Sequence, residues 1–180
     1  LVSVTSAGLQ SDGHSTRPKL SSDGDVVAFL SVATNLDARD TDTVQDVYVR
    51  DRQGQTTTLV SERLGSGPSA QGCYGVSISA DGRFVAFDCI DDNVVPGDTN
   101  GRSDVFVRDL VTQTTERVSV GPAGEQSDRE SMRPSISADG RFVAFVSAAG
   151  NWFPSAPLYS SAVFVRDRQA GTTIPVTLLS

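Results

Sequence analysis

Short runs rich in hydrophobic residues follow one another along the chain, separated by polar residues, Gly and Pro. Toward the end of the chain these runs are Arg133–Ser137, Arg141–Ser147, Ala162–Asp167 and Thr172–Leu179. Val, Phe, Ile and Thr dominate them, as they do in β-strands, and no stretch has the spacing of an amphipathic helix. The second run is apolar on both faces, which is typical of strands that are covered on both sides. The pattern therefore predicts an all-β chain of short strands.

The pattern repeats every 58 residues. Two blocks keep this spacing through three copies, one around an Asp-Gly turn and one ending in Val-Arg-Asp. The copies are Ser22–Phe29, Ala80–Phe87 and Ala138–Phe145 for the first block, and Asp46–Asp51, Asp104–Asp109 and Ala162–Asp167 for the second. Four-stranded sheets that repeat every roughly 40 to 60 residues are typical of propeller blades. We predict one partial β-propeller domain over 1–180, with repeats 1–58, 59–116 and 117–174 and a closing strand over 172–179.

An Asp-Gly pair lies between the first two strands of each repeat. Ser79–Arg83 fits a three-residue hairpin, in which Gly82 takes the left-handed conformation that Gly adopts without strain. The segment Pro134–Phe145 followed by Val163–Asp167 resembles the TolB-type, WD40-like β-propeller repeat, and the resemblance covers the whole chain. It implies three four-stranded antiparallel blades. Its members include periplasmic and secreted binding proteins and the propeller domains of some peptidases.

Three blades do not complete a ring, since propellers usually have about four to eight. By the repeat offset, Leu1–Thr5 matches the outermost strand of a blade, although the third repeat already has an outer strand at Thr172–Leu179. Two interpretations stay open. Two chains pair as a homodimer and form a six-bladed ring, or the chain is part of a longer propeller. Exposed apolar blade faces favour an assembled state.

The composition restricts the partners and the chemistry. The 180 residues include 15 Lys and Arg, 22 Asp and Glu, one His and two Cys, with a net charge of -7. Without a basic stripe we expect no nucleic-acid partner. Without an apolar run of roughly 20 residues we expect no membrane insertion. One His and two Cys exclude the usual zinc clusters and argue against His-based catalysis.

The two cysteines belong to the second repeat. Continuing the hairpin register outward from Ser79 and Arg83 places Cys73 opposite Cys89, at the separation that a disulfide needs. The equivalent positions are serines in both other repeats: Ser15, Ser31, Ser131 and Ser147. We predict a Cys73–Cys89 disulfide and therefore an extracytoplasmic location, periplasmic or secreted. The alternative is two buried free thiols.

Acidic residues cluster in the second-to-third connection of two repeats. Asp98, Asn100 and Asp104 resemble the latter part of the calcium loops in integrin-type propellers, and Asp40, Asp42 and Asp46 lie at matching places. Calcium prefers several oxygens from a turning loop, so these residues are candidate calcium ligands. Pro96 and Ala38 replace the first ligand of those loops. The alternative is an Asn100-Gly101 turn with Asp side chains that cap backbone amides.

The third repeat has aromatic residues in place of the acidic ones. Trp152, Phe153 and Tyr159 are candidate binding-surface residues if they are exposed; alternatively Trp152 packs in a core or an assembly interface. The long connections, such as Gly121–Met132 and Ala149–Ser161, emerge on one face of a propeller. We expect binding on that long-loop face, because loops on a rigid scaffold carry function.

These features favour a non-catalytic binding or scaffold module that takes a protein or glycan ligand. One alternative is the propeller domain of a larger peptidase-like hydrolase, whose Ser-His-Asp domain would be separate, because no Gly-x-Ser-x-Gly motif is present. Another alternative is a propeller glycosidase or lyase, for which two opposed carboxylates would be needed. No cofactor other than calcium is expected.

Overall fold

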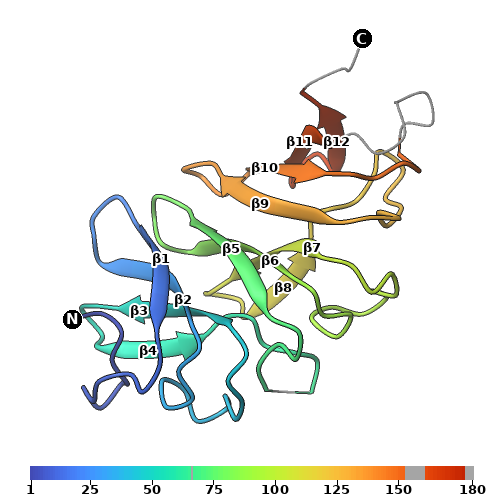
Figure 1. Ribbon diagram of the computed structural model, residues 1–180. Helices are drawn as coiled ribbons and strands as arrows, with labels where there is room; N and C mark the ends of the chain where they lie inside the picture. Colours follow the sequence, from blue (N-terminus) through green and yellow to red (C-terminus); the bar gives the residue numbers. More distant parts are fainter. Residues whose placement is uncertain (66, 153–160, 177–180) are drawn as a thin grey trace.

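The computed structural model describes residues 1–65, 67–152 and 161–176, and it folds them into three four-stranded antiparallel sheets (Figure 1). Blade 1 contains β1 (Ser15–Leu20), β2 (Val26–Ser31), β3 (Asp46–Asp51) and β4 (Thr56–Leu59). Blade 2 contains β5 (Cys73–Ile78), β6 (Phe84–Cys89), β7 (Asp104–Asp109) and β8 (Thr114–Arg117). Blade 3 contains β9 (Ser131–Ile136), β10 (Phe142–Ser147), β11 (Ala162–Asp167) and β12 (Thr172–Pro175). The predicted all-β fold is confirmed, and no described segment is a helix that could span a membrane.

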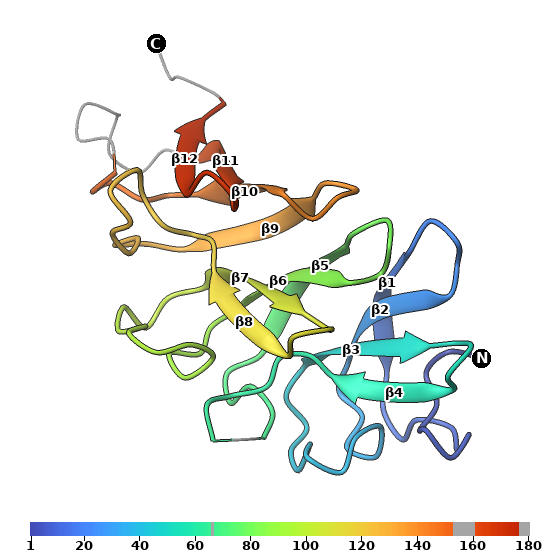
Figure 2. The same cartoon turned by 180° about the vertical axis from the view of Figure 1, so that it is seen from behind.

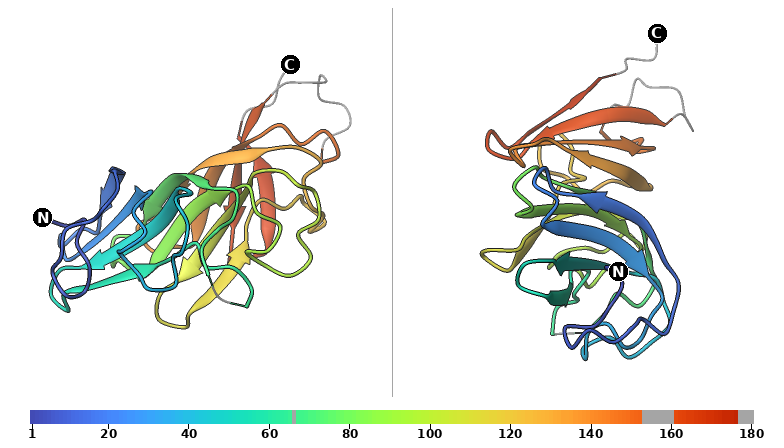
Figure 3. Two further views of the ribbon diagram at one scale, coloured as in Figure 1. Left: turned by 60° about the horizontal axis from the view of Figure 1, so that its bottom comes forward. Right: turned by 90° about the vertical axis from the view of Figure 1, so that its left-hand side faces the viewer.

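The blades follow one another in chain order. In each sheet the strands are also in chain order, so each blade is a simple antiparallel meander. β5 contacts both β1 and β9. The first strands therefore lie together on the inner side of an arc, and the later strands spread outward from it (Figures 2 and 3). Ring completion by dimerisation or by a longer chain stays a prediction.

The turn between the first two strands is one residue longer than expected. The backbone N–H of Ser79 donates to the carbonyl of Phe84 at 2.9 Å, so the loop holds residues 80–83. The left-handed glycine is confirmed, with φ of +72° at Gly82. These turns also join neighbouring blades, because Ala80 N–H donates to the carbonyl of Ala138 at 2.9 Å and the Ala80 carbonyl accepts from Ser22 N–H at 2.8 Å.

Hydrophobic side chains fill the two spaces between adjacent blades. Leu30 and Val49 of blade 1 belong to one buried cluster with Phe87 of blade 2. Val107 of blade 2 belongs to a second cluster with Phe145 of blade 3. Burial of one such side chain stabilises the fold by about 1.5–3 kcal/mol. Each blade thus needs a neighbour to cover its apolar faces.

The first residues of the chain do not form an outer strand. The carbonyl of Val4 accepts from Thr57 Oγ1 at 2.5 Å and that of Thr5 accepts from Arg50 Nη1 at 3.1 Å, so this segment lies against the outer part of blade 1. Val120 lies in the same way against blade 3, where its carbonyl accepts from Thr173 Oγ1 at 2.7 Å. The outer strands are β4, β8 and β12. The predicted outer strand at 1–5 is therefore wrong, because these residues correspond to the link that follows an outer strand.

Candidate functional site

The predicted disulfide is present at the inner edge of blade 2. Cys73 pairs with Cys89 across β5 and β6, with 4.0 Å between the Cα atoms and both residues fully buried. In blade 1 the Oγ atoms of Ser15 and Ser31 are hydrogen-bonded at 3.0 Å instead. In blade 3 the Oγ atoms of Ser131 and Ser147 are bonded at 2.9 Å. One covalent and two hydrogen-bonded links therefore fix the same position of the three blades.

A groove of about 510 Å³ runs along the inner strands of the arc. It is lined by cationic, aromatic and small residues of β1, β5 and β9 and by one carboxylate of β6. The lining residues are Arg17, Pro18, Lys19, Tyr74, Gly75, Val76, Asp88, Met132, Arg133 and Pro134. The groove lies on the propeller axis, where the three inner strands meet. We call it the axial groove.

The backbone of the inner strands is distorted at the groove. Arg17 has φ of +51° and Arg133 has φ of +58°, a region that non-glycine residues rarely adopt, and each precedes a proline. The strand pairing shifts register at both places. A bulge redirects a side chain, and strain of about 1–3 kcal/mol per residue persists mainly where the surroundings impose it, often at functional sites. Both exposed arginines belong to the groove lining.

The equivalent position of the inner strand of blade 2 is Gly75, where blades 1 and 3 have Arg17 and Arg133. A Cβ atom on Gly75 would lie 2.1 Å from Oδ1 of Asp88 and 3.0 Å from Cδ of Pro134. The Asp88 carboxylate thus occupies the space that a side chain at position 75 would need. Its Oδ1 accepts from the backbone N–H of Arg133 at 3.0 Å, which joins blade 2 to blade 3.

The groove gathers positive charge on an acidic protein. Its lining holds three cationic side chains, Arg17, Lys19 and Arg133, and one carboxylate, although the chain carries a net charge of -7. Burial raises the pKa of Asp88 to about 6, against the hydrogen bond from Arg133 N–H and the charges of Arg17 and Arg133. The groove is therefore positive in net charge and suits an anionic group.

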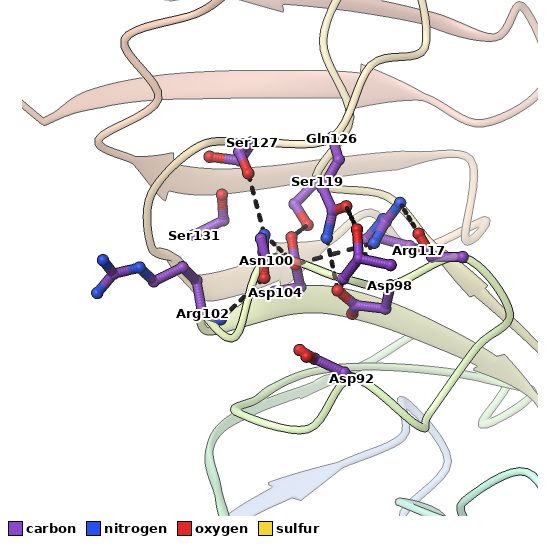
Figure 4. Close-up of polar contacts among 12 residues, drawn as sticks. Asp92, Asp98, Asn100, Arg102, Asp104, Arg117, Ser119, Gln126, Ser127 and Ser131 are labelled. Atoms are coloured by element: carbon purple, nitrogen blue, oxygen red, sulfur yellow. Dashed lines mark hydrogen bonds and ion pairs between the residues drawn. The ribbon is translucent and has the colours of Figure 1, made fainter.

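The predicted calcium residues of blade 2 surround an arginine (Figure 4). Arg117 Nη1 lies 3.1 Å from Asp98 Oδ1 and 4.0 Å from Asp104 Oδ2. Asn100 Nδ2 donates to Asp104 Oδ2 at 2.9 Å, and Gln126 Nε2 donates to Asp98 Oδ1. Burial, then repulsion from Asp104, raises the pKa of Asp98 to about 6, and Arg117 opposes the rise. The structure brings the three predicted residues together: Asp98 and Asp104 lie at the guanidinium of Arg117, and Asn100 joins them through its bond to Asp104.

The predicted calcium residues of blade 1 also lie together. One carboxylate oxygen from each of Asp40, Asp42 and Asp46 lies within 4.8 Å of the others. No described cation is paired with any of the three. The two loop clusters therefore share positions but differ in charge.

Trp152 is buried and does not belong to a binding surface. Its indole is 5% exposed and meets the rings of Phe145 and Phe164 edge-on, with centroids 6.2 and 5.2 Å away. The prediction of a binding role for Trp152 is corrected to one of core packing, because the large ring fills the space beside blade 3. The other two predicted residues, Phe153 and Tyr159, lie outside the described residues.

Sequence reasoning missed the axial groove. Asp88 occupies a position that is Leu30 in blade 1 and Val146 in blade 3, so comparison of the repeats would have revealed a lone carboxylate in an apolar row. The Arg-Pro pairs at 17–18 and 133–134, replaced by Gly75-Val76, were a second signal. Their left-handed backbone could not be foreseen, because proline restricts the preceding residue to extended conformations in most contexts.

No protein-family model and no curated protein matches the sequence. Solved structures do resemble the fold. The β-propeller domain of the Trilobed protease from Pyrococcus furiosus matches with a TM-score of 0.59 at 14% identity, over 91% of this chain and 42% of that one. A structure described as a TolB from Agrobacterium tumefaciens matches with a TM-score of 0.55 at 21% identity, over 94% and 50%.

Peptidases with a propeller domain are also similar. An acylaminoacyl peptidase from Pyrococcus horikoshii matches with a TM-score of 0.53 at 13% identity, over 90% of this chain and 24% of that one. The chain spans half or less of the length of these structures. At such identities the likeness shows the fold alone: the chain forms three blades of a TolB-like β-propeller.

Proposed function

We propose that the protein is a non-catalytic binding or scaffold module of an extracytoplasmic compartment, and that its axial groove takes up a carboxylate-bearing segment of a protein or glycan ligand. One observation carries the proposal: three cationic side chains, two on strained backbone, gather at the propeller axis of an acidic chain. Carboxylates form short, charge-assisted hydrogen bonds with guanidinium groups, and these bonds are stronger than neutral ones. The long-loop face stays a second predicted contact surface.

The groove also offers a site for apolar contact. Tyr74 is 46% exposed, and half-buried Met132 lies at the equivalent position of the next blade. An aromatic ring and a flexible thioether adapt to different ligand surfaces. A ligand segment that carries apolar groups beside its carboxylates would therefore fit the groove better than a ligand with carboxylates alone.

The described lining does not resemble a hydrolytic centre. Among the lining residues the only carboxylate is Asp88, whereas glycoside cleavage usually uses two carboxylates about 5–10 Å apart. No lining residue is a histidine that could serve as a general base. The groove is therefore better suited to binding than to bond cleavage. The oxidised Cys73–Cys89 pair supports the extracytoplasmic location.

A second candidate function follows from the similarity to peptidase propellers. As the propeller domain of a larger hydrolase, the same groove would guide acidic segments toward a separate catalytic domain. An α/β domain encoded beside these blades would favour this candidate.

The test uses a fluorescein-labelled hexaglutamate peptide and fluorescence anisotropy, with labelled hexalysine as the charge control. We expect hexaglutamate to bind, added salt to weaken it, and the Arg17→Gln/Arg133→Gln variant to bind about tenfold more weakly. Arg102→Gln is the matched control, because this exposed arginine pairs with Glu130 on the long-loop face. Competition by oligogalacturonate would extend the ligand class to acidic glycans. Equal binding of both peptides, or no effect of the double variant, would contradict the proposal.

A further inference from the structure

The acidic cluster of blade 1 is built from one turning loop and the start of a strand. Asp40 and Asp42 lie in the connection from β2 to β3, and Asp46 is the first residue of β3. The turn is held by its own side chains, since Asp40 Oδ1 accepts from Asp42 N–H at 3.1 Å and Asp42 Oδ1 accepts from Val44 N–H at 2.7 Å. Asp40 is 4% exposed and Asp46 is fully buried. These carboxylates are fixed and largely removed from water.

A buried oxygen of this cluster, Oδ2 of Asp46, has no hydrogen-bond partner. Asp46 Oδ1 accepts from Ser61 Oγ at 2.6 Å and from Ser69 N–H at 3.0 Å. Asp46 Oδ2 is buried and accepts no hydrogen bond. An unpaired buried carboxylate oxygen is costly unless an ion or a donor meets it. Asp40 and Asp42 each offer an oxygen within 4.8 Å of the Asp46 ligand atom.

Blade 2 shows how the same arrangement is neutralised by protein groups. By the repeat offset, Asp98 corresponds to Asp40, Asn100 to Asp42 and Asp104 to Asp46. There the Asn100 amide replaces one carboxylate and donates to Asp104. The guanidinium of Arg117 supplies a positive charge 3.1 Å from Asp98. Two carboxylates in blade 2 thus share one cationic side chain.

Blade 1 has no such cation. Leu59 takes the place of Arg117, because β4 pairs Leu59 with Tyr48 where β8 pairs Arg117 with Phe106. Among the described residues, no Lys, Arg or His forms a salt bridge with the cluster. The hydroxyl of Tyr48, which Phe106 lacks, donates to Asp40 Oδ2. The three carboxylates of blade 1 therefore lie together without a described salt-bridge partner, because nearby Arg39 pairs with Asp37 and Glu62 instead. In blade 2, two carboxylates share Arg117.

We propose that Asp40, Asp42 and Asp46 of blade 1 bind a calcium ion, and that Arg117 replaces this ion in blade 2. Three carboxylates from a compact loop are ligands that hard divalent cations prefer, and water would complete the six to eight oxygens that calcium takes. The proposal goes beyond the proposed ligand-binding function and does not depend on the axial groove.

The first test counts calcium. Equilibrium dialysis of the full chain should give one bound ion per chain, because Arg117 fills the blade 2 site. Thermal unfolding in millimolar calcium should occur at a higher temperature than in EDTA. Asp42→Asn gives blade 1 the asparagine that blade 2 has at this position, and it should weaken calcium binding about tenfold or more. The control is Asp92→Asn, which removes one negative charge from a half-exposed position on the loop face. No bound calcium in the wild-type chain, or unchanged affinity in Asp42→Asn, would overturn the proposal.

A terbium experiment locates the ion. Tyr48 touches Asp40, so excitation of its ring should sensitise luminescence from Tb³⁺ that replaces calcium. Tyr48→Phe should lose most of this luminescence and keep one bound calcium by dialysis. Luminescence that survives Tyr48→Phe would place the ion elsewhere and overturn the assignment to blade 1. This readout holds even if a carboxylate variant fails to fold.

Discussion

The backbone N–H of Arg133 donates a 3.0 Å hydrogen bond to the buried carboxylate of Asp88, and this bond joins blade 3 to blade 2 at the axial groove. The bond satisfies the backbone at the residue that has left-handed geometry, φ +58°. It also fixes a carboxylate that is 2% exposed where the other blades have aliphatic side chains. One acceptor thus positions both a groove arginine and the interface between two blades.

Asp88→Asn should stabilise the protein at neutral pH. Burial raises the pKa of Asp88 to about 6, so the folded state holds the proton more tightly than the unfolded state. The stability from protonated Asp88 is complete below about pH 4 and lost as the pH rises through about 6. A neutral amide avoids that loss, worth up to about 3 kcal/mol at pH 7.5. Urea unfolding from pH 4 to 7.5 measures it, and the variant should approach the wild type at pH 4.

Asp92→Asn is the control for this pH profile, because Asp92 is a half-exposed carboxyl of the same blade. A lower stability of Asp88→Asn throughout the pH range would contradict the prediction. That result would mean that the ionised carboxylate is a better acceptor for Arg133 N–H than its burial costs.

Gly75→Ala should destabilise the protein by about 1–3 kcal/mol, the usual cost of overpacking. The new Cβ would lie 2.1 Å from Oδ1 of Asp88, so the carboxylate must move away from Arg133. The loss should shrink in an Asp88→Ala background, which removes the clashing atoms. Gly97→Ala is the control, since its Cβ meets no atom within 4 Å and only its φ of +76° is unfavourable. Equal losses at both glycines would show that the close approach does not matter.

Cys73→Ser/Cys89→Ser should fold, because blades 1 and 3 already use a pair of serines at this position. We expect the double variant to lose about 3 kcal/mol, as expected for opening a loop of 16 residues. Urea unfolding of the oxidised wild type and the double variant measures the loss. The single variant Cys73→Ser should be no more stable than the double one. A double variant that does not fold would contradict the equivalence of the three blades.

The period of the sequence predicted the blades well, because each strand is defined by local hydrophobic pattern and local turns. The predicted pairing of Cys73 with Cys89 is confirmed, although the predicted register of the strand residues between these cysteines and the turn is wrong by one residue. The turn holds one residue more than expected, and a bulge between Cys73 and Gly75 removes the shift again. A bulge inserts one extra residue into a strand without changing its hydrophobic character, so the strand pattern does not reveal it.

The candidate sites were less predictable, because they depend on contacts between repeats. The acidic residues of both loops could be found from their spacing. That Arg117 occupies the blade 2 cluster depends on how β8 pairs with β7, which brings Arg117 opposite Phe106. The burial of Trp152 depends on Phe145 and Phe164 of blade 3.

Arg117→Leu should destabilise blade 2 and make it depend on calcium. The side chains of Asp98 and Asp104 are 1% and 0% exposed, so removing the guanidinium leaves two buried carboxylates without a counter-ion. Loss of one partner from a buried ion pair typically costs about 3–5 kcal/mol. Leucine is the residue that blade 1 has at this position, so calcium should restore part of the stability in the variant. Urea unfolding in EDTA and in millimolar calcium measures both effects, with Arg117→Lys as the charge-preserving control. Full stability of Arg117→Leu in EDTA would show that Asp98 and Asp104 need no positive partner. It would then no longer follow from blade 2 that the carboxylates of blade 1 need a cation.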